Sequence, residues 1–217
     1  MLKNSLLALG ASATIAAIAP TASAQSVNPK WSIKLGVSRL ALRDKVDLFA
    51  GGALVPGAAI NTKAQYTASI QIGYFLTDHI AFNFTGGIPP KVTINGKGSI
   101  APFGRLASTR YGPTAFTLQY HPLRHGAFRP YVGAGGSYMI DFSSKDGAFT
   151  NVKVHNDLAP VVEGGAEIML SPRFGVFADA KKAWLRPKAF GSFGGAPVVA
   201  RTYLDPLVLS AGGVVHF

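Results

Sequence analysis

Apolar and polar residues alternate strictly along residues 65–76, whose sequence is QYTASIQIGYFL. The even positions from Tyr66 to Leu76 are all apolar, and the odd positions are polar or glycine until Phe75. A period of two predicts a β-strand with two unlike faces. The apolar face of such a strand covers a protein core or faces lipid, and the rest of the chain distinguishes these two cases.

The same alternation recurs along the chain and predicts eight strands, at residues 30–42, 63–76, 79–87, 114–121, 128–142, 158–170, 173–184 and 203–217. The connections 77–78, 121–127 and 171–172 are short, and the connections 43–62, 88–113, 143–157 and 185–202 are long. Short turns on one side and long loops on the other are typical of a transmembrane β-barrel with periplasmic short turns. We therefore predict an all-β fold: an eight-stranded antiparallel transmembrane barrel with long extracellular loops.

Four charged side chains alternate with apolar neighbours: Glu163 and Glu167 in one predicted strand, and Asp179 and Lys181 in another. A charge facing lipid costs about 2–4 kcal/mol, so this face is expected to line the interior. We predict a lumen-facing polar network of Lys34, Gln65, Gln71, Glu163, Glu167, Asp179 and Lys181. Side chains about fill an eight-stranded barrel, so we expect ion pairs that plug the lumen and no general porin activity. The alternative is a polar constriction below a ligand pocket.

Aromatic residues gather near both ends of the predicted strands. Those near the short turns are Trp31, Tyr74, Phe75, Tyr120, Phe128, Tyr131, Phe174 and Phe217. Those toward the long loops are Phe84, Tyr138, Phe142, Trp184 and Tyr203. Two belts of amphipathic rings match the two interfaces of a bilayer, which favours lipid over a soluble core.

The first residues of the chain are typical of an export signal. Lys3 is the only charge there, an apolar run follows, and Ala22-Ser23-Ala24 provides a small-residue cleavage site. We predict a cleaved signal peptide at residues 1–24 and a single barrel domain at residues 25–217, located in the cell outer membrane. The chain has no cysteine, which excludes a disulfide scaffold.

The net charge of +11 is unevenly distributed, because residues 79–140 contain no Asp or Glu. A basic surface indicates an anionic partner. Nucleic acid is a poor candidate for an exported chain, so we expect no nucleic acid and instead the phosphates of outer-membrane lipid and lipopolysaccharide. The residues predicted to face lipopolysaccharide are Lys91, Lys97, Arg105 and Arg110; a solvated surface without a partner is the alternative.

No catalytic constellation is evident, and we predict no enzyme, no cofactor and no metal. His121 and His125 share a spacing of four residues, but Pro122 and Gly126 predict a turn there. Ser143 or Ser144 with His155 would make a nucleophile and base for a lipid hydrolase, yet no third orienting group accompanies them.

Five segments of the chain are characteristic when taken together: YFLTDHIAFNF (74–84), GPTAFTLQYHP (112–122), RPYVGAGGSYMIDF (129–142), FADAKKAWL (177–185) and LDPLVLSAGGVVHF (204–217). This set resembles the OmpW family of small outer-membrane proteins. The chain departs from the family pattern at Asn83, where an acidic residue is usual, and at Ile88-Pro89-Pro90-Lys91. The resemblance implies an eight-stranded outer-membrane barrel that passes small hydrophobic molecules into the barrel and sideways into the bilayer. The terminal Phe217 resembles the signal that the barrel-assembly machinery reads.

We therefore interpret the chain as a narrow channel or carrier for small apolar ligands. Two alternatives belong to other classes: a barrel without transport that stabilises the envelope or binds partners at the surface, and an integral lipid-modifying enzyme. A soluble exported barrel fits worse, because Tyr66, Ile70 and Ile72 would then need a second core to cover them.

Overall fold

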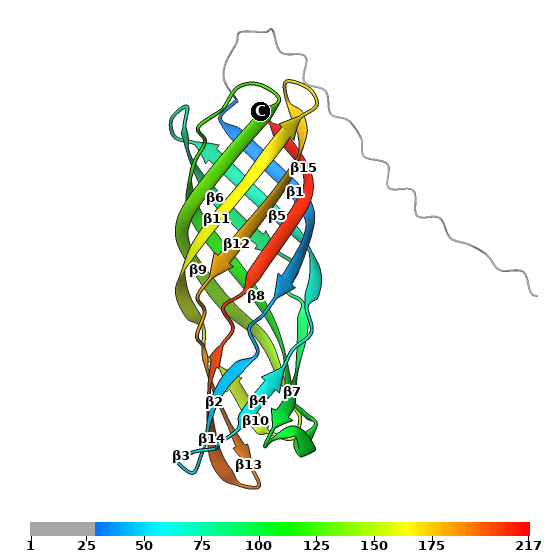
Figure 1. Cartoon of the computed structure of the whole chain (residues 1–217), viewed down its shortest axis with the longest axis vertical. Helices are drawn as coiled ribbons and strands as arrows, with labels where there is room; N and C mark the ends of the chain where they lie inside the picture. Colours follow the sequence, from blue (N-terminus) through cyan, green and yellow to red (C-terminus); the bar gives the residue numbers. More distant parts are fainter. Residues whose placement is uncertain (1–28) are drawn as a thin grey trace, which may run out of the picture.

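The computed structural model describes residues 29–217, which form one long antiparallel β-barrel (Figure 1). The predicted signal peptide, residues 1–24, lies outside the described residues. No helix within residues 29–217 is long and apolar enough to cross a membrane.

Eight strands close the barrel in the order β9-β8-β6-β5-β1-β15-β12-β11, with β11 pairing back to β9. They are β1 (Trp31–Ala41), β5 (Gln65–Phe75), β6 (Ile80–Gly87), β8 (Arg105–Tyr120), β9 (Phe128–Asp146), β11 (Asp157–Met169), β12 (Phe174–Ala183) and β15 (Leu207–His216). The first and last of these strands pair from Ser32 opposite His216 to Ala41 opposite Leu207. The prediction of an eight-stranded antiparallel barrel is confirmed.

The four long connections contain regular β-structure, which the sequence analysis treated as loops. The remaining elements are β2 (Lys45–Ala50), β3 (Ala53–Leu54), β4 (Ala58–Asn61), β7 (Lys91–Gly98), the short 3₁₀ helix η1 (Ala101–Phe103), β10 (Thr150–Val154), β13 (Lys188–Phe193) and β14 (Ala196–Tyr203). β8 and β9 also run on beyond the predicted strands. These elements extend the barrel past the membrane; Figure 1 shows this extension as its lower part.

The extension forms because its strands have an apolar inner face of their own. Val46 and Leu48 of β2, Ile60 of β4 and Val198 of β14 are buried together in one cluster. A second apolar cluster joins Leu40, Tyr111 and Met139 of the eight barrel strands to Val92 of β7 and to Leu185. The interior of the outer half of the molecule is therefore largely apolar.

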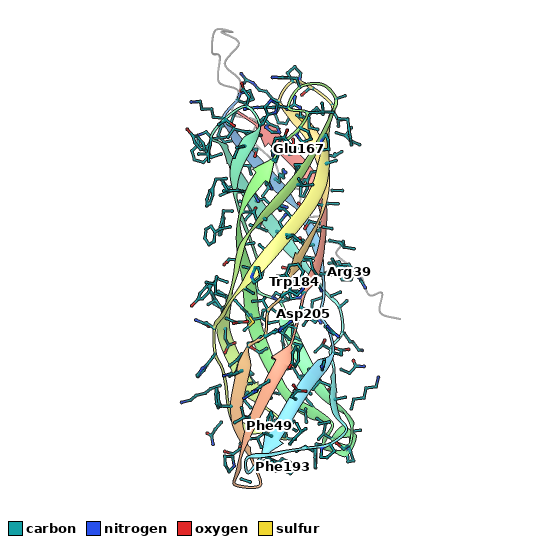
Figure 2. The ribbon with its side chains drawn as sticks, turned by 60° about the vertical axis from the view of Figure 1, so that its left-hand side comes forward. Arg39, Phe49, Glu167, Trp184, Phe193 and Asp205 are labelled. Carbon is teal, nitrogen blue, oxygen red and sulfur yellow. The ribbon has the colours of Figure 1, made fainter. Side chains whose placement is uncertain are left out.

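The outer surface carries exposed aromatic rings near both interfaces, with two exceptions to the predicted belts. Trp31, Phe128 and Phe174 are exposed near the short turns, whereas Phe75 and Tyr131 are buried inside the barrel. Both exceptions occupy inward positions of the alternation, so the prediction from nearness to a strand end alone was wrong for them. Figure 2 places Trp184 about midway along the molecule, between Glu167 and the outer tip at Phe193.

Glycine allows close approach of strands where the barrel is narrow. A Cβ added at Gly135 would lie 1.9 Å from the carbonyl oxygen of Phe116 on the neighbouring strand. The glycine-rich GAGG segment at residues 133–136 therefore serves strand packing in β9, in line with a strand position that only glycine fits.

Candidate functional site

The centre of the lumen holds a buried ionic cluster around Lys181 of β12. Its Nζ lies 2.6 Å from Oε2 of Glu163 and 2.9 Å from Oδ2 of Asp179. Gln71 of β5 contacts Asp179 and Lys181: its Nε2 donates to Asp179 at 2.6 Å, and its Oε1 accepts from Lys181 at 3.2 Å. All four side chains are buried, so the lumen is filled from wall to wall at this level.

Two residues of β8 complete the hydrogen bonding of Glu163. Thr117 donates its hydroxyl to Oε1 of Glu163, and Nε2 of Gln119 donates to the same oxygen at 2.9 Å. On the other side, the hydroxyl of Tyr131 donates to Asp179 at 3.1 Å. Buried charges are tolerated only when paired and hydrogen-bonded, and these contacts supply that compensation.

A second ion pair lies nearer the periplasmic end. Nζ of Lys34 is 3.0 Å from Oε1 of Glu167, and Nε2 of His216 is 2.7 Å from Oε2 of Glu167. Nζ of Lys34 also lies 3.8 Å from the centre of the Tyr131 ring, a cation–π contact that links the two clusters. We call the two clusters together the lumen plug.

The structure brings together six of the seven residues predicted for the polar network. Gln65 shares the inward frame of β5 but lies apart, because its side chain donates to the carbonyl oxygen of Lys63 near the outer end of the strand. Thr117, Gln119 and His216 also belong to the lumen plug and were not predicted. Thr117 and Gln119 alternate with Phe116 and Leu118, so the same period-two pattern would have found them.

The periplasmic end of the lumen is also filled with side chains. The ring of His121 lies between the rings of Phe75 and Tyr131, at 4.9 and 5.2 Å between centres. The guanidinium of Arg124 sits 3.8 Å from the centre of the Phe75 ring and donates to the carbonyl oxygen of Thr77 at 3.2 Å. Water and solutes therefore meet a packed layer of side chains on the periplasmic side of the lumen plug.

Acid is expected to destabilise the barrel through His121, which lies just beyond the end of β8. Burial, and then the positive charge of Lys34, lower the pKa of His121 from 6.5 to about 4; Arg124 and His216 act in the same direction, and Glu167 opposes them. Between these two values the unfolded chain binds a proton that the folded chain does not. The free energy of unfolding therefore falls as pH drops from 6.5 to 4, by about 1–2 kcal/mol between pH 7 and 5.

Urea midpoints at pH 7 and pH 5 test this expectation in the wild-type protein, in His121→Gln and in His125→Gln. The exposed His125 provides the control, so His125→Gln should keep the wild-type pH dependence. A His121→Gln protein that loses as much stability at pH 5 as the wild type would show that other groups cause the loss.

An apolar cavity of about 60 Å³ lies on the extracellular side of the lumen plug. Lys181 contributes to its floor, and Leu40, Val161 and Val208 contribute to its apolar wall. Two further apolar cavities, of about 40 and 60 Å³, follow within the extension and share Ile60 and Ile94. The outer half of the lumen thus contains apolar spaces and ends at an ionic floor.

The barrel wall is interrupted beside this cavity. β6 pairs with β8 only as far as Thr85 opposite Ala115, and β7 pairs with β8 only from Lys91 opposite Arg110. Between these pairings, residues 86–90 and 111–114 face each other without ladder hydrogen bonds. Proline cannot donate to a ladder, and Pro89 and Pro90 fall in this interval. We call this interval the wall break; Gly86, Gly87, Ile88, Pro90 and Gly112 line the cavity from there.

The predicted basic loop residues are exposed, but they lie on strands and in two separate places. Lys91 pairs directly with Arg110 between β7 and β8, just outside the wall break. Lys97 pairs with Ala59 and Arg105 with Asn95, farther toward the outer tip. The structure therefore brings Lys91 and Arg110 together and leaves Lys97 and Arg105 apart from them.

The other candidate residues have ordinary structural surroundings. His121 contacts Oε1 of Gln119 at 3.2 Å. Ser144 donates to Asp141 at 2.9 Å, and the ring of His155 packs on Phe190. Residues 29–217 contain no group of three His, Cys, Asp or Glu side chains that could hold a metal ion. That the chain is not an enzyme stays a prediction.

The C-terminal residue Phe217 closes the barrel seam at its periplasmic end. Its backbone exchanges two hydrogen bonds with Trp31, at 2.9 and 3.0 Å, and its side chain is exposed. Recognition of Phe217 by the barrel-assembly machinery stays a prediction.

Comparison with known proteins identifies the family. Outer membrane protein AlkL of Ectopseudomonas oleovorans is 28% identical over 199 residues, which cover 91% of this chain and 86% of that protein. The dibenzothiophene metabolism operon protein PahQ of Pseudomonas aeruginosa is 29% identical over 180 residues, covering 83% of this chain and 85% of that protein.

Solved structures show the same barrel. The crystal structure of the outer membrane protein OprG from Pseudomonas aeruginosa superposes with a TM-score of 0.81 at 21% identity and covers 88% of this chain and 96% of that one. The solid-state NMR structure of AlkL in lipid bilayers gives a TM-score of 0.73 at 28% identity, covering 92% and 95%. The model of the OmpW family matches residues 15–217, and the chain belongs to this family of outer-membrane β-barrels.

Proposed function

We propose that this barrel carries small hydrophobic molecules from the cell exterior into the outer membrane, through the apolar outer lumen and out at the wall break. The main support for this proposal is the position of the wall break. It lies beside the apolar cavity that borders the extracellular side of the lumen plug. An apolar solute that reaches this point has lipid beside it and the charged lumen plug on its periplasmic side.

The lumen plug favours the sideways route. Passing straight through would require the solute to separate Lys181 from Glu163 and Asp179, and Lys34 from Glu167. An apolar solute offers no replacement hydrogen bonds or charges for these buried groups, so separating them is costly. The wall break has no ladder hydrogen bonds to separate.

The cavity beside the wall break is too small for a polycyclic solute in this conformation. Its volume is about 60 Å³, so the lining must move apart before a larger molecule fits, and the wall break must widen before that molecule leaves. Gly86, Gly87 and Gly112 lie around this interval and allow the backbone conformational freedom that such widening needs.

The relatives support an apolar substrate class. PahQ, and DoxH of a Pseudomonas strain at the same 29% identity over 180 residues, are named as dibenzothiophene metabolism operon proteins. Dibenzothiophene is a fused aromatic compound without charge, which fits an apolar lumen. We infer the same chemical class for this chain, without assigning one compound.

Vesicle transport measures the proposed function directly. The folded protein in lipid vesicles is expected to speed the entry of a fluorescent apolar solute above that in empty vesicles, while ionic conductance stays near the empty-vesicle level because the lumen plug blocks ions. Folded protein that passes neither solute nor ions would instead favour the envelope-stabilising or surface-interaction role. Large ionic conductance would contradict a sealed lumen.

A further inference from the structure

Three strands bring three cationic side chains together on the outer surface of the extension. Lys91 of β7 pairs with Arg110 of β8, and Lys145 of β9 pairs with Ser108, two residues from Arg110 on the same face of β8. Val92 and Thr109, which lie between these positions, are buried, so the three cations point outward. Opposite residues in a sheet are about 5 Å apart and diagonal ones about 7–8 Å, so the cations surround one spot.

These cations have no partner of opposite charge in the described part of the chain. No ion pair or hydrogen bond of Lys91, Arg110 or Lys145 side chains occurs within residues 29–217. The neighbouring carboxylates are occupied: Asp141 accepts from Thr109 and Ser144, and Asp146 accepts from backbone N–H groups. Like charges directly opposite in a sheet are destabilising, and a bound anion would remove this repulsion.

The cations surround a hollow with hydroxyl groups. A space of about 310 Å³ is lined by Lys91, Ser108, Thr109, Arg110, Ser143 and Lys145. Ser108 is only 3% exposed although it lies on the outward face, which places it at the base of the hollow. Ammonium, guanidinium and hydroxyl donors converging from three strands are the donors that phosphate oxygens accept best.

The hollow lies where the outer surface changes from apolar to cationic. Phe142 is the extra residue of a β-bulge, because Arg110 pairs with Ser143 and Tyr111 with Asp141. The bulge leaves the Phe142 ring 58% exposed, immediately next to Ser143. Ile88 at the wall break is likewise exposed. Exposed aromatic rings mark the bilayer interface, so the hollow is at the level of the lipid headgroups of the outer leaflet.

We propose that Lys91, Arg110 and Lys145 bind a phosphate group of lipopolysaccharide at the outer membrane surface. The depth beside Phe142 favours a lipid-borne phosphate over a free one, because the acyl chains of the same molecule would lie along the apolar surface below. This site includes Lys145, which the sequence analysis did not select, and leaves out Lys97 and Arg105. It does not depend on the transport proposal.

Native mass spectrometry of the folded protein with added diphosphoryl lipid A tests this site. The test variant is K91Q/R110Q/K145Q, and the matched control is K97Q/R105Q/K188Q, which removes the same charge from exposed positions elsewhere. Wild type and control should retain lipid A with the same Kd, and the test variant should bind about tenfold more weakly or worse. Dephosphorylated lipid A should bind all three proteins as weakly as diphosphoryl lipid A binds the test variant.

Three outcomes would overturn the proposal. An equal loss of affinity for diphosphoryl lipid A in the test variant and in the control would show that net charge alone attracts the lipid. Equal binding of phosphorylated and dephosphorylated lipid A to the wild type would exclude phosphate recognition. Displacement of lipid A by inorganic phosphate at an equal concentration would identify a free-anion site. The shift in gel mobility between unheated and heated samples checks that each variant is folded. If the triple variant does not fold, the single variant K145Q replaces it, and a smaller loss of affinity for lipid A is expected.

Discussion

Uptake of apolar solutes is expected to stop when a disulfide closes the wall break and to return when the disulfide is reduced. The variant is Pro89→Cys with Gly112→Cys. A Cβ at Gly112 would lie 3.9 Å from Cβ of Pro89, within the range of about 3.5–4.5 Å that disulfides require. The chain contains no cysteine of its own, so no competing pair forms.

The expected effect is large because the cross-link holds the two sides of the exit together. Solute entry into vesicles should fall about tenfold or more on oxidation, since a covalent bridge of fixed geometry prevents the wall break from widening. Each single-cysteine variant, treated with the same oxidant, provides the control and should transport normally. The mass of the oxidised protein verifies complete cross-linking. If the fully cross-linked protein transports as fast as the same protein with its disulfide reduced, exit at this position is ruled out.

Replacing Glu167 by Gln is expected to destabilise the barrel strongly. Glu167 is 1% exposed, forms an ion pair with Lys34, and has its Oε2 2.7 Å from Nε2 of His216. The change leaves the Lys34 ammonium buried without a carboxylate partner, beside the rings of Tyr131 and Phe177. Breaking one side of a buried pair typically costs about 3–5 kcal/mol, because the remaining charge loses its compensation. The urea midpoint of the folded protein in detergent micelles measures the loss.

A second replacement distinguishes this mechanism from simple loss of packing. The double variant Lys34→Met with Glu167→Leu removes both charges and keeps apolar volume in the lumen, so it should recover most of the lost stability. The exposed Lys63→Met provides a control for the lysine replacement and should leave the midpoint unchanged. A double variant as unstable as Glu167→Gln alone would mean that the unpaired charge of Lys34 is not the cause.

The alternation of side chains was enough to place most of the lumen plug. Within one strand, the positions of Glu163 and Glu167 differ by four, and within the next those of Asp179 and Lys181 differ by two. Positions that differ by an even number lie on one face of a strand. Lipid on the other side makes the choice of face unambiguous, because charge there is costly. Ion pairing between strands depends on register, which alternation alone does not determine.

Residues at strand ends were predicted less well. Phe75 and Tyr131 were assigned to the interface belt from nearness to a turn, yet each follows the inward frame of its strand and packs against His121. Gln65 follows the inward frame but lies too far along β5 to reach the lumen plug. Whether a side chain points inward and how far along the barrel axis it lies are independent properties. The alternation in the sequence shows only the first.

The barrel, the number of its membrane strands, the family and the charged inner face could all be predicted from the sequence, because each depends on local periodicity or on motifs within one segment. Three features became visible only in the folded chain: the outer connections continue as strands, the wall break separates residues 86–90 from 111–114, and Lys145 joins Lys91 and Arg110. These features arise from pairing between segments far apart in the chain. Their register is set by packing across the whole barrel, which a period along one strand does not contain.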